Sequence, residues 1–365
     1  MTTAVDRRED LSFLASYSRK WIDNQLNKEY SGARFFWNKR RAEEFARTPI
    51  ETLLFDKYFL DAKRWMYPGV AETILDIYEQ RKHRNIRVVC ILGGFGTGKS
   101  GGIGAALNWL QWFEFSCKFD PTSERACPQE FYGLKPTSIV AFIALSKTRD
   151  KSEKITFSEM KPAFESQFNK DYFPINPNVK SVVEITANNT LVFPNTATEA
   201  ANAGWSVYSF VMDEISFLEL IDNSSRNRGS TRDVYDQAQE AYASADGRRF
   251  SRFKRDGMGI LLSSLNYSED FLMTKIRNAY NGDISESETY FKVFLPWKVN
   301  PEKFGGKKYF YFDTNKFEII KNDKEVAALD KYYIEVPIEK VIFGENSDDP
   351  NDELLRKVRS GQLKV

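Results

Sequence analysis

The sequence predicts an α/β fold with a doubly wound, mostly parallel sheet over residues 84–300. Short apolar runs rich in β-branched residues, typical of buried parallel strands, recur along this region. Segments with helical patterning separate these runs, and such alternation is typical of a doubly wound sheet. The first run, at 86–92, leads through a glycine-rich turn into an apolar segment that predicts a helix from Ser100 to about Phe115.

The region before the sheet, residues 10–80, is predicted to be helical because large apolar side chains recur among charges at spacings of three and four. Pro68-Gly69 interrupts it, and a further helix is expected at 70–80. A polar helix is expected from Thr148 onward, and a small hairpin at 309–320. The remaining strands are expected at 138–145, 181–185, 190–193, 206–212, 258–262 and 288–295, the second and third of these forming a hairpin.

These elements divide the chain into three predicted regions. Residues 1–83 would form a helical N-terminal or lid region, residues 84–300 the core, and residues 301–365 a small C-terminal lid or linker subdomain. The composition supports a globular chain with a large core, since 42% of the residues are hydrophobic and 15% are aromatic.

Charge and composition exclude several classes of protein. Lys plus Arg number 52 and Asp plus Glu 51, so nucleic acid could be bound only by a local basic patch. A single histidine, His83, and three cysteines without paired spacing argue against a Ser-His-Asp triad or a zinc site. No stretch approaches the roughly 20 apolar residues of a membrane helix. The N-terminus has no apolar signal core, so a cytoplasmic protein without membrane contact is expected.

Residues 93–100 match the phosphate-binding pattern G-x-x-x-x-G-K-[ST], reading Gly93, Gly94, Phe95, Gly96, Thr97, Gly98, Lys99 and Ser100. Glycines let successive backbone N–H groups point at phosphate oxygens, and the following helix adds the positive end of its dipole. Lys99 is expected to reach the β- and γ-phosphates of ATP, and the Ser100 hydroxyl to ligate Mg²⁺. The alternative is a glycine-rich turn with an incidental lysine. The buried strand before the loop and the apolar helix after it favour phosphate binding.

Two carboxylates end the apolar run 210–212, the pattern of a Walker B strand. At the carboxyl end of a parallel strand, Asp213 would lie beside Ser100 and hold Mg²⁺ through water. Glu214 could orient and deprotonate the attacking water. A second acid here is typical of motor-type ATPases and is often missing from kinases and small GTPases. The alternative is an acidic turn at a helix N-terminus.

Two serines, Ser263 and Ser264, end the predicted strand 258–262. Their hydroxyls could hydrogen-bond the γ-phosphate or the attacking water and so report hydrolysis to the rest of the sheet. An ordinary polar strand end is the alternative.

A basic segment lies just before that strand and contains Arg248, Arg249, Arg252, Lys254 and Arg255, with two aromatic residues between them. It could contact the DNA backbone, where each neutralised phosphate adds salt-sensitive affinity. It could instead present an arginine finger to the ATP of a neighbouring subunit. A solvated basic face, balanced by nearby aspartates, is the third interpretation.

In serial order these segments resemble the ATPase portion of the large terminases of tailed bacteriophages, the motors that package viral DNA into procapsids. The resemblance covers residues 50–340 and rests on the order GGFGTGKS, IVAFIALSKTRDKSEK, AGWSVYSFVMDE, RDVYDQAQEAYASADGRRFSRF, GILLSSLNYSEDFL and FKVFLPWKVNP. It implies a P-loop NTPase fold of the ASCE type, with ATP and Mg²⁺ as cofactors and Ser263-Ser264 as the motif that couples hydrolysis to movement. It also implies double-stranded DNA, a portal protein and a small terminase subunit as partners, in the cytoplasm of the host cell.

Three features depart from that family. Many terminases carry an arginine inside the P-loop, but residues 94–97 contain none. The positive charge that stabilises the γ-phosphate would then come from elsewhere, for example from a partner subunit, and Arg149, Arg226, Arg228 or Arg232 could supply it. No adenine-binding glutamine is evident at 65–69, where Tyr67 could stack on adenine instead. Residues 301–365 are too few for the family's RNase-H-like nuclease. We therefore expect either an ATPase-domain fragment or a packaging ATPase without its own nuclease.

The main hypothesis is thus a DNA-translocating packaging ATPase that works as a homo-oligomeric ring. In it, Glu214 activates water, Lys99 and Mg²⁺ stabilise the γ-phosphate, and the two serines pass the change to a DNA-gripping surface. A helicase or recombination-type P-loop ATPase acting on nucleic acid is the second hypothesis. A nucleotide-dependent switch or scaffold with little turnover is the third.

Overall fold

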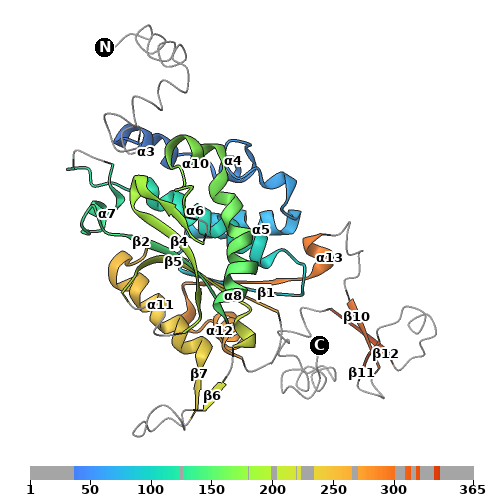
Figure 1. Cartoon of the computed structure of the whole chain (residues 1–365). Helices are drawn as coiled ribbons and strands as arrows, with labels where there is room; N and C mark the ends of the chain where they lie inside the picture. Colours follow the sequence, from blue (N-terminus) through green and yellow to red (C-terminus); the bar gives the residue numbers. More distant parts are fainter. Residues whose placement is uncertain are drawn as a thin grey trace.

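A seven-stranded sheet forms the centre of the computed structural model, with helices around it (Figure 1). The structure describes residues 37–123, 126–179, 181–198, 204–218, 220–222, 234–264, 270–300, 309–313, 318–320 and 333–337. Part of the predicted helical region, residues 10–36, lies outside the described residues, and so do Arg226, Arg228 and Arg232.

The strand order across the sheet is β3-β4-β2-β5-β8-β1-β9, and every neighbouring pair is parallel except β3 with β4. The strands are β1 (Val88–Gly93), β2 (Val140–Ser146), β3 (Val183–Ile185), β4 (Thr190–Thr196), β5 (Ser206–Asp213), β8 (Met258–Ser263) and β9 (Thr289–Phe294). The predicted mostly parallel sheet is confirmed, including the antiparallel β3–β4 hairpin. Because β8 lies between β1 and β5, the order is that of the ASCE type.

The helices of the described residues precede, connect and follow these strands. They are α3 (Lys39–Ala46), α4 (Ile50–Phe55), η2 (Ala62–Arg64), α5 (Pro68–Arg81), η3 (Lys99–Gly104), α6 (Ala105–Ser116), α7 (Pro128–Phe131), α8 (Arg149–Lys151), η4 (Ser152–Phe157), α9 (Ser158–Met160), η5 (Lys161–Glu165), α10 (Gln167–Tyr172), η6 (Thr186–Asn188), η8 (Ile215–Phe217), α11 (Gln237–Phe253), α12 (Phe271–Tyr280), η10 (Ile284–Glu286) and α13 (Pro296–Val299). The predicted break at Pro68 proves to be the first turn of α5, where a proline needs no hydrogen-bonded N–H.

Smaller strands form two further sheets. One pairs β6 (Leu220–Asp222) with β7 (Val234–Asp236). The other has the order β11-β10-β12 and consists of β10 (Tyr309–Asp313), β11 (Glu318–Ile320) and β12 (Tyr333–Pro337). The predicted hairpin at 309–320 is confirmed by the antiparallel pairing of β10 with β11, whereas β12 was not predicted.

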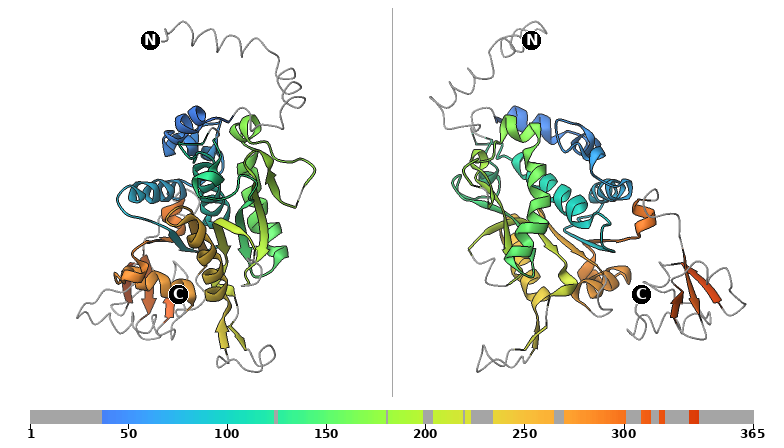
Figure 2. Two further views of the ribbon diagram at one scale, coloured as in Figure 1. Left: turned by 90° about the vertical axis from the view of Figure 1, so that its left-hand side faces the viewer. Right: turned by 45° about the vertical axis from the view of Figure 1, so that its right-hand side comes forward.

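Successive residues of the central strands enter two different hydrophobic cores. In β1, Val89 and Ile91 pack in the core that contains α5 and α6, while Val88, Cys90 and Leu92 pack in the core that contains α11 and α12. Since side chains alternate between the two faces of a sheet, both faces must be covered. Figure 2 shows helices on either side of the sheet, which confirms the doubly wound fold.

The described N-terminal helices share a core with the helix that follows the glycine-rich loop. Aromatic side chains lie at this contact: the Phe59 ring meets Phe113 and Trp109 of α6 at 6.1 and 6.4 Å between ring centroids. The indole N–H of Trp37 also donates to the carbonyl of Ser116, at the end of α6, at 2.9 Å. Aromatic pairs add about 0.5–1.5 kcal/mol beyond their buried area, so these helices are held firmly against α6.

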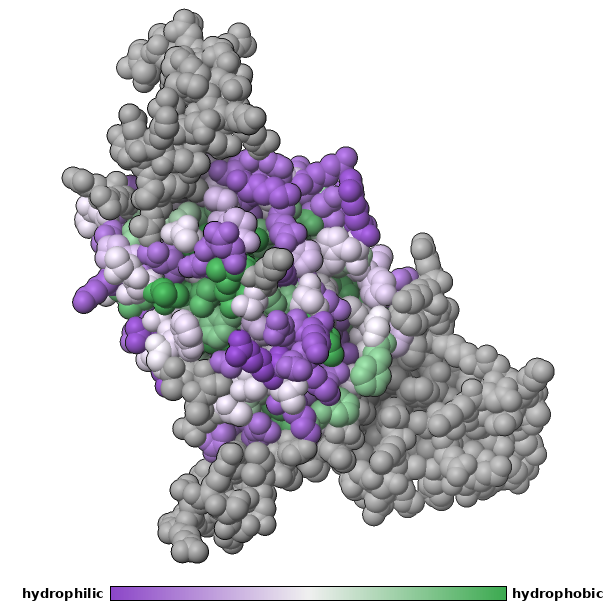
Figure 3. All heavy atoms as spheres, in the orientation of Figure 1, coloured by the Kyte–Doolittle hydropathy of each residue, from purple (hydrophilic) through white to green (hydrophobic). Residues whose placement is uncertain are grey.

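Hydrophilic and hydrophobic residues are interspersed over the described surface in Figure 3, as is usual for a globular protein. Within the described residues, no helix combines the length and the apolar character that crossing a bilayer requires.

Candidate active site at the carboxyl edge of the sheet

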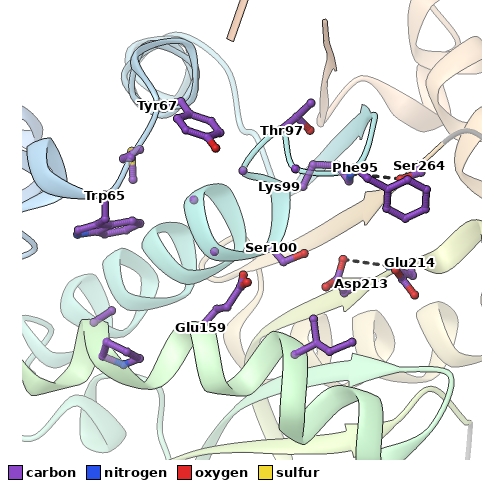
Figure 4. A pocket seen from close by; sticks show the side chains of 18 of the residues that line it. Trp65, Tyr67, Phe95, Thr97, Lys99, Ser100, Glu159, Asp213, Glu214 and Ser264 are labelled. Atoms are coloured by element: carbon purple, nitrogen blue, oxygen red, sulfur yellow. Dashed lines mark hydrogen bonds between the residues drawn. The ribbon is translucent and has the colours of Figure 1, made fainter. Parts of the chain in front are cut away.

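A cavity of about 680 Å³ lies at the carboxyl ends of β1, β5 and β8 (Figure 4). Its polar end is lined by residues 95–102 together with Asp213, Glu214 and Ser264. Its apolar lining consists of Leu60, Trp65, Met66, Tyr67, Ile155, Pro162 and Ala163. In Figure 4, Trp65 and Tyr67 lie at the end away from Asp213 and Glu214. In open α/β sheets, ligands bind in the crevice outside the carboxyl ends of the strands, so this cavity is the candidate site.

The glycine-rich loop leaves β1 and turns sharply into η3. Gly96 and Gly98 have φ angles of 72° and 81°, in the left-handed region where a side chain would be strained. The hydroxyl of Thr97 donates to the carbonyl of Gly94 at 2.8 Å, and this hydrogen bond within the loop stabilises the turn. The first helical turn, η3, is a π-helical turn that begins at Lys99, one residue earlier than predicted. The unpaired N–H groups of such a helix start favour an anion.

Lys99 is a buried cation surrounded by neutral oxygens. Only 8% of its surface is exposed, and its ammonium group donates to the carbonyls of Gly93 and Gly94, both at 2.8 Å, and to the Ser264 hydroxyl at 3.3 Å. None of the described carboxylates forms an ion pair with it. Burial lowers the pKa of the ammonium below its ordinary value, against the opposing effect of Asp213 and Glu214. A buried charge without a counter-charge is unfavourable, so the site is suited to an anion.

The two acids end β5 in different environments. Asp213 is 3% exposed, and its two carboxylate oxygens accept from the Thr156 hydroxyl at 2.9 Å and from the backbone N–H of Glu214 at 3.0 Å. Glu214 has a φ of 54°, a strained conformation typical of functional sites, and its carboxylate lies 4.0 Å from the ammonium of Lys151. In Figure 4 the Ser100 hydroxyl points toward Asp213.

A family model described as "Uncharacterized protein MJ0330, N-terminal P-loop domain" matches residues 15–321. The chain belongs to this family. It is therefore a P-loop domain. The seven-stranded sheet and the loop at 93–100, between β1 and η3, agree with this assignment.

Solved structures similar to this P-loop domain include phage terminases. The large terminase of bacteriophage HK97 is 12% identical with a TM-score of 0.44, over 79% of this chain and 50% of that chain. The large terminase of the thermophilic bacteriophage D6E is 9% identical with a TM-score of 0.41, over 67% of this chain and 48% of that chain. The chain thus spans at most half of the length of these two structures. No curated protein matches the sequence.

The residues of the P-loop domain fit a magnesium ion shared with phosphate. Mg²⁺ is usually held by one or two carboxylates, waters and substrate phosphates rather than by an all-protein cage. No group of three metal-binding side chains occurs within the described residues. Ser100 and Asp213 supply one hydroxyl and one carboxylate on the same wall of the cavity, which is the donor set that a magnesium–phosphate complex needs.

The structure separates the predicted P-loop residues into two groups. Phe95, Gly96, Thr97, Gly98, Lys99 and Ser100 line the cavity, as does the predicted adenine-stacking residue Tyr67. Gly93 is the last residue of β1, and it and Gly94 lie behind the cavity wall, where their carbonyls accept from Lys99. Phe95 is 75% exposed at the tip of the loop, with its ring 6.0 Å from the Lys99 ammonium.

The two predicted coupling serines occupy successive layers beside the P-loop. Ser264 lines the cavity and accepts from Lys99 at 3.3 Å. Ser263 is fully buried behind it, where its hydroxyl accepts from the backbone N–H of Ser216 at 3.1 Å and donates to the carbonyl of Ser264 at 3.0 Å. The pair therefore connects the P-loop lysine to η8, the turn that follows the acidic pair.

Three residues of this site were missed by the sequence analysis: Lys151, Thr156 and Glu159, all on the helical segment after β2. Glu159 lines the cavity, and a Cβ built on Gly101 would lie 2.6 Å from its carboxylate. Burial, and then the charge of Asp213, raise the pKa of Glu159 above its ordinary value. The only signal in the sequence was the polarity of the helix predicted from Thr148, which does not say which of its faces meets the loop.

One predicted DNA contact is wrong. Arg249 is fully buried in α11, where it forms an ion pair with Asp246 at 2.6 Å and donates to the carbonyl of Asp256 at 3.2 Å. The aliphatic part of its side chain packs against the tight turn at Gly257, and its charge is satisfied internally. Arg249 thus has no surface to offer to a phosphate backbone.

The other basic residues lie away from the cavity. Arg252, Lys254 and Arg255 are exposed and Arg248 is half-buried, around the end of α11 that leads into the start of β8. This is the edge of the sheet opposite to the site, because the site lies where β8 ends. Arg149 is exposed at the start of α8 and is not among the residues that line the cavity.

Proposed function

We propose that this P-loop domain hydrolyses ATP to translocate double-stranded DNA into a viral procapsid, in the manner of a terminase large subunit. The observation that carries the ATPase part is the meeting of Lys99, a buried cation that forms no ion pair with any described carboxylate, with Ser100, Asp213 and Glu214 in one cavity. The loop and the acids are more than a hundred residues apart in the sequence, and their convergence at one edge of the sheet supports a shared role in ATP hydrolysis.

In this proposal each residue has a separate role. Lys99 exchanges its carbonyl partners for phosphate oxygens, and the N–H groups at the start of η3 bind the same anion. Ser100 and Asp213 hold a magnesium ion, whose chemistry is to neutralise the negative charge that develops on the phosphate oxygens. Glu214, which lines the cavity near Lys151, orients the attacking water and accepts its proton.

The apolar end of the cavity would take the nucleoside. Tyr67 and Trp65 offer aromatic rings at this end, and Pro162 and Ala163 are among the other apolar residues that line the cavity. We propose that Tyr67 stacks on the adenine, because base–aromatic stacking contributes about 1–3 kcal/mol per base.

DNA translocation rests on the serial order of the sequence segments and on the serine pair beside Lys99. The hydrogen bond from Ser216 to Ser263 provides a route by which a change at the γ-phosphate could reach the segment after β5. Arg252, Lys254 and Arg255 are the proposed DNA contacts, and Arg149, Arg226, Arg228 and Arg232 remain the proposed sources of a finger in a ring of subunits. The proposed partners are the portal protein and the small terminase subunit, in the host cytoplasm.

Steady ATP hydrolysis measured over a series of protein concentrations, with and without double-stranded DNA, tests this proposal. We expect the specific activity to rise steeply with protein concentration, because an arginine supplied by a neighbour requires association, and to rise further with DNA. A flat specific activity would contradict the trans arginine. Absence of hydrolysis even with DNA would favour a nucleotide-dependent switch. Strand separation without binding to a portal complex would favour a helicase.

The lowered pKa of Lys99 predicts how nucleotide affinity depends on pH. In the free protein burial lowers this pKa, and a bound phosphate anion would raise it again. At a pH between the pKa of Lys99 in the free protein and its higher pKa in the ATP complex, the complex holds one proton more than the free protein. The affinity for ATP should therefore fall as the pH rises through the pKa of the free protein. Calorimetric titration at alkaline pH in two buffers of different ionisation enthalpy should reveal this proton uptake. Uptake that is absent, or that persists in Lys99→Arg, whose guanidinium does not titrate, would contradict the prediction.

A further inference from the structure

The carboxylate of Asp213 is held on both of its oxygens by groups of the protein. Thr156 donates to one oxygen at 2.9 Å, and the backbone N–H of Glu214 donates to the other at 3.0 Å. The backbone contact is available to any residue other than proline at position 214. The contact from Thr156, by contrast, depends on a hydroxyl that comes from a different element, η4.

The oxygen of the Thr156 hydroxyl is itself in contact with a second hydroxyl, that of Ser146. An ionised carboxylate only accepts hydrogen bonds, so the Thr156 hydroxyl must be the donor to Asp213. Its oxygen then accepts from the Ser146 hydroxyl, which lies 3.3 Å away. Ser146, Thr156 and Asp213 are 5%, 1% and 3% exposed, so water cannot easily replace any member of this chain. Hydrogen bonds in such buried chains strengthen one another.

The surrounding fold keeps Thr156 in place. Ser146 and Asp213 are the last residues of β2 and β5, which pair side by side up to Leu145 and Met212. One turn before Thr156, the Ser152 hydroxyl donates to the carbonyl of Ala144 at 2.7 Å and anchors η4 to β2. Each carboxylate oxygen of Asp213 accepts only one of these bonds and so keeps a free lone pair, and in Figure 4 Asp213 lies beside the Ser100 hydroxyl.

We propose that Thr156 is a positioning residue for the magnesium site: its hydroxyl, oriented by Ser146, sets the direction in which Asp213 presents its carboxylate to the metal. The inference rests on the proposed ATPase function. Partners that orient a ligating carboxylate typically contribute about 10- to 100-fold to metal affinity. Thr156 does not touch the nucleotide, so its contribution should appear in the metal dependence alone.

The test measures how much Mg²⁺ is needed for half-maximal binding of a fluorescent ATP analogue. Thr156→Val keeps the shape of the side chain and removes the hydroxyl, and we expect the Mg²⁺ midpoint to rise by about 10- to 100-fold. Binding of the analogue in the presence of a chelator should stay at the level of the parent protein. Thr156→Ser restores the hydroxyl and should return the midpoint close to that of the parent.

Two further variants keep the test decisive. Ser158→Ala removes an exposed hydroxyl that donates to the carbonyls of Lys154 and Ile155 and does not contact Asp213, and it should leave the Mg²⁺ midpoint unchanged. Ser146→Ala removes the group that orients Thr156 and should shift the midpoint in the same direction by less, even if Thr156→Val does not fold. An unchanged midpoint in Thr156→Val and Ser146→Ala, or an equal shift in Ser158→Ala, overturns the inference. A parent protein that binds no nucleotide overturns the proposed function itself, and this inference with it.

Discussion

Replacing Glu214 by Gln is expected to slow steady ATP hydrolysis by about 10²- to 10⁴-fold, the usual contribution of a general base. The amide keeps the size of the side chain and can still contact a water, but it cannot accept the proton. The bond from the backbone N–H of residue 214 to Asp213 is unaffected, so the metal and nucleotide should still bind. Phosphate release measures the first effect, and equilibrium binding of a fluorescent ATP analogue measures the second.

Glu159 supplies the matched control, because it is the other glutamate that lines the cavity. Its carboxyl lies against Gly101 at the start of the P-loop helix, and its raised pKa reflects burial and the nearby Asp213. Glu159→Gln should change hydrolysis by less than Glu214→Gln does. If hydrolysis survived in Glu214→Gln and disappeared in Glu159→Gln, Glu159 would be the base.

Replacing Gly257 by Ala is expected to lower the free energy of unfolding by about 2–5 kcal/mol, from backbone strain and a clash together. Gly257 has a φ of 78°, and a Cβ there would lie 2.1 Å from the carbonyl oxygen of Tyr208. That oxygen belongs to the backbone of β5, so no side-chain rotation relieves the overlap. The turn also sets the start of β8, the strand between the P-loop strand and the Walker B strand. Denaturant unfolding followed by circular dichroism measures the loss.

Two other glycines separate the causes. Gly282 has a φ of 75° with open space around it, so Gly282→Ala should show only the backbone strain, about 1–2 kcal/mol. Gly247 lies within α11, with open space and no positive φ, and Gly247→Ala should stabilise the protein by up to about 1 kcal/mol. If Gly257→Ala were no more destabilising than Gly282→Ala, the clash with β5 would not be real.

Local patterns were enough to predict the central strands and the P-loop. The fully buried strands β1, β2, β5 and β8 are short apolar runs. Because both faces of these strands are buried, their apolar residues are consecutive in the sequence and do not alternate with polar ones. Helix α11 was not predicted, because its buried stripe consists mainly of alanines, Ala238, Ala241 and Ala245, which carry little hydrophobic signal.

Side-chain partners at a distance could not be predicted in the same way. Arg249 and Arg252 look alike in the sequence, three residues apart on one helix, yet one is buried with Asp246 and the other is exposed. Thr156 resembles any threonine of a polar helix until β2 and β5 bring it to Asp213. Such pairings depend on the rotation and register of whole elements, which no single segment determines.

The sequence by itself determined the α/β class, the order of the motifs and the identity of the phosphate-binding loop, because glycine, lysine and serine at fixed spacing meet a local requirement of backbone and charge. Only the tertiary structure decided which residues surround that loop. Lys99 is deprived of water by the packing around it, Asp213 is oriented from η4, and Glu159 faces the cavity because the helices after β2 pack beside η3. Desolvation and hydrogen-bond direction arise from many distant contacts at once, and they exist only when the sheet and both of its helical layers are assembled.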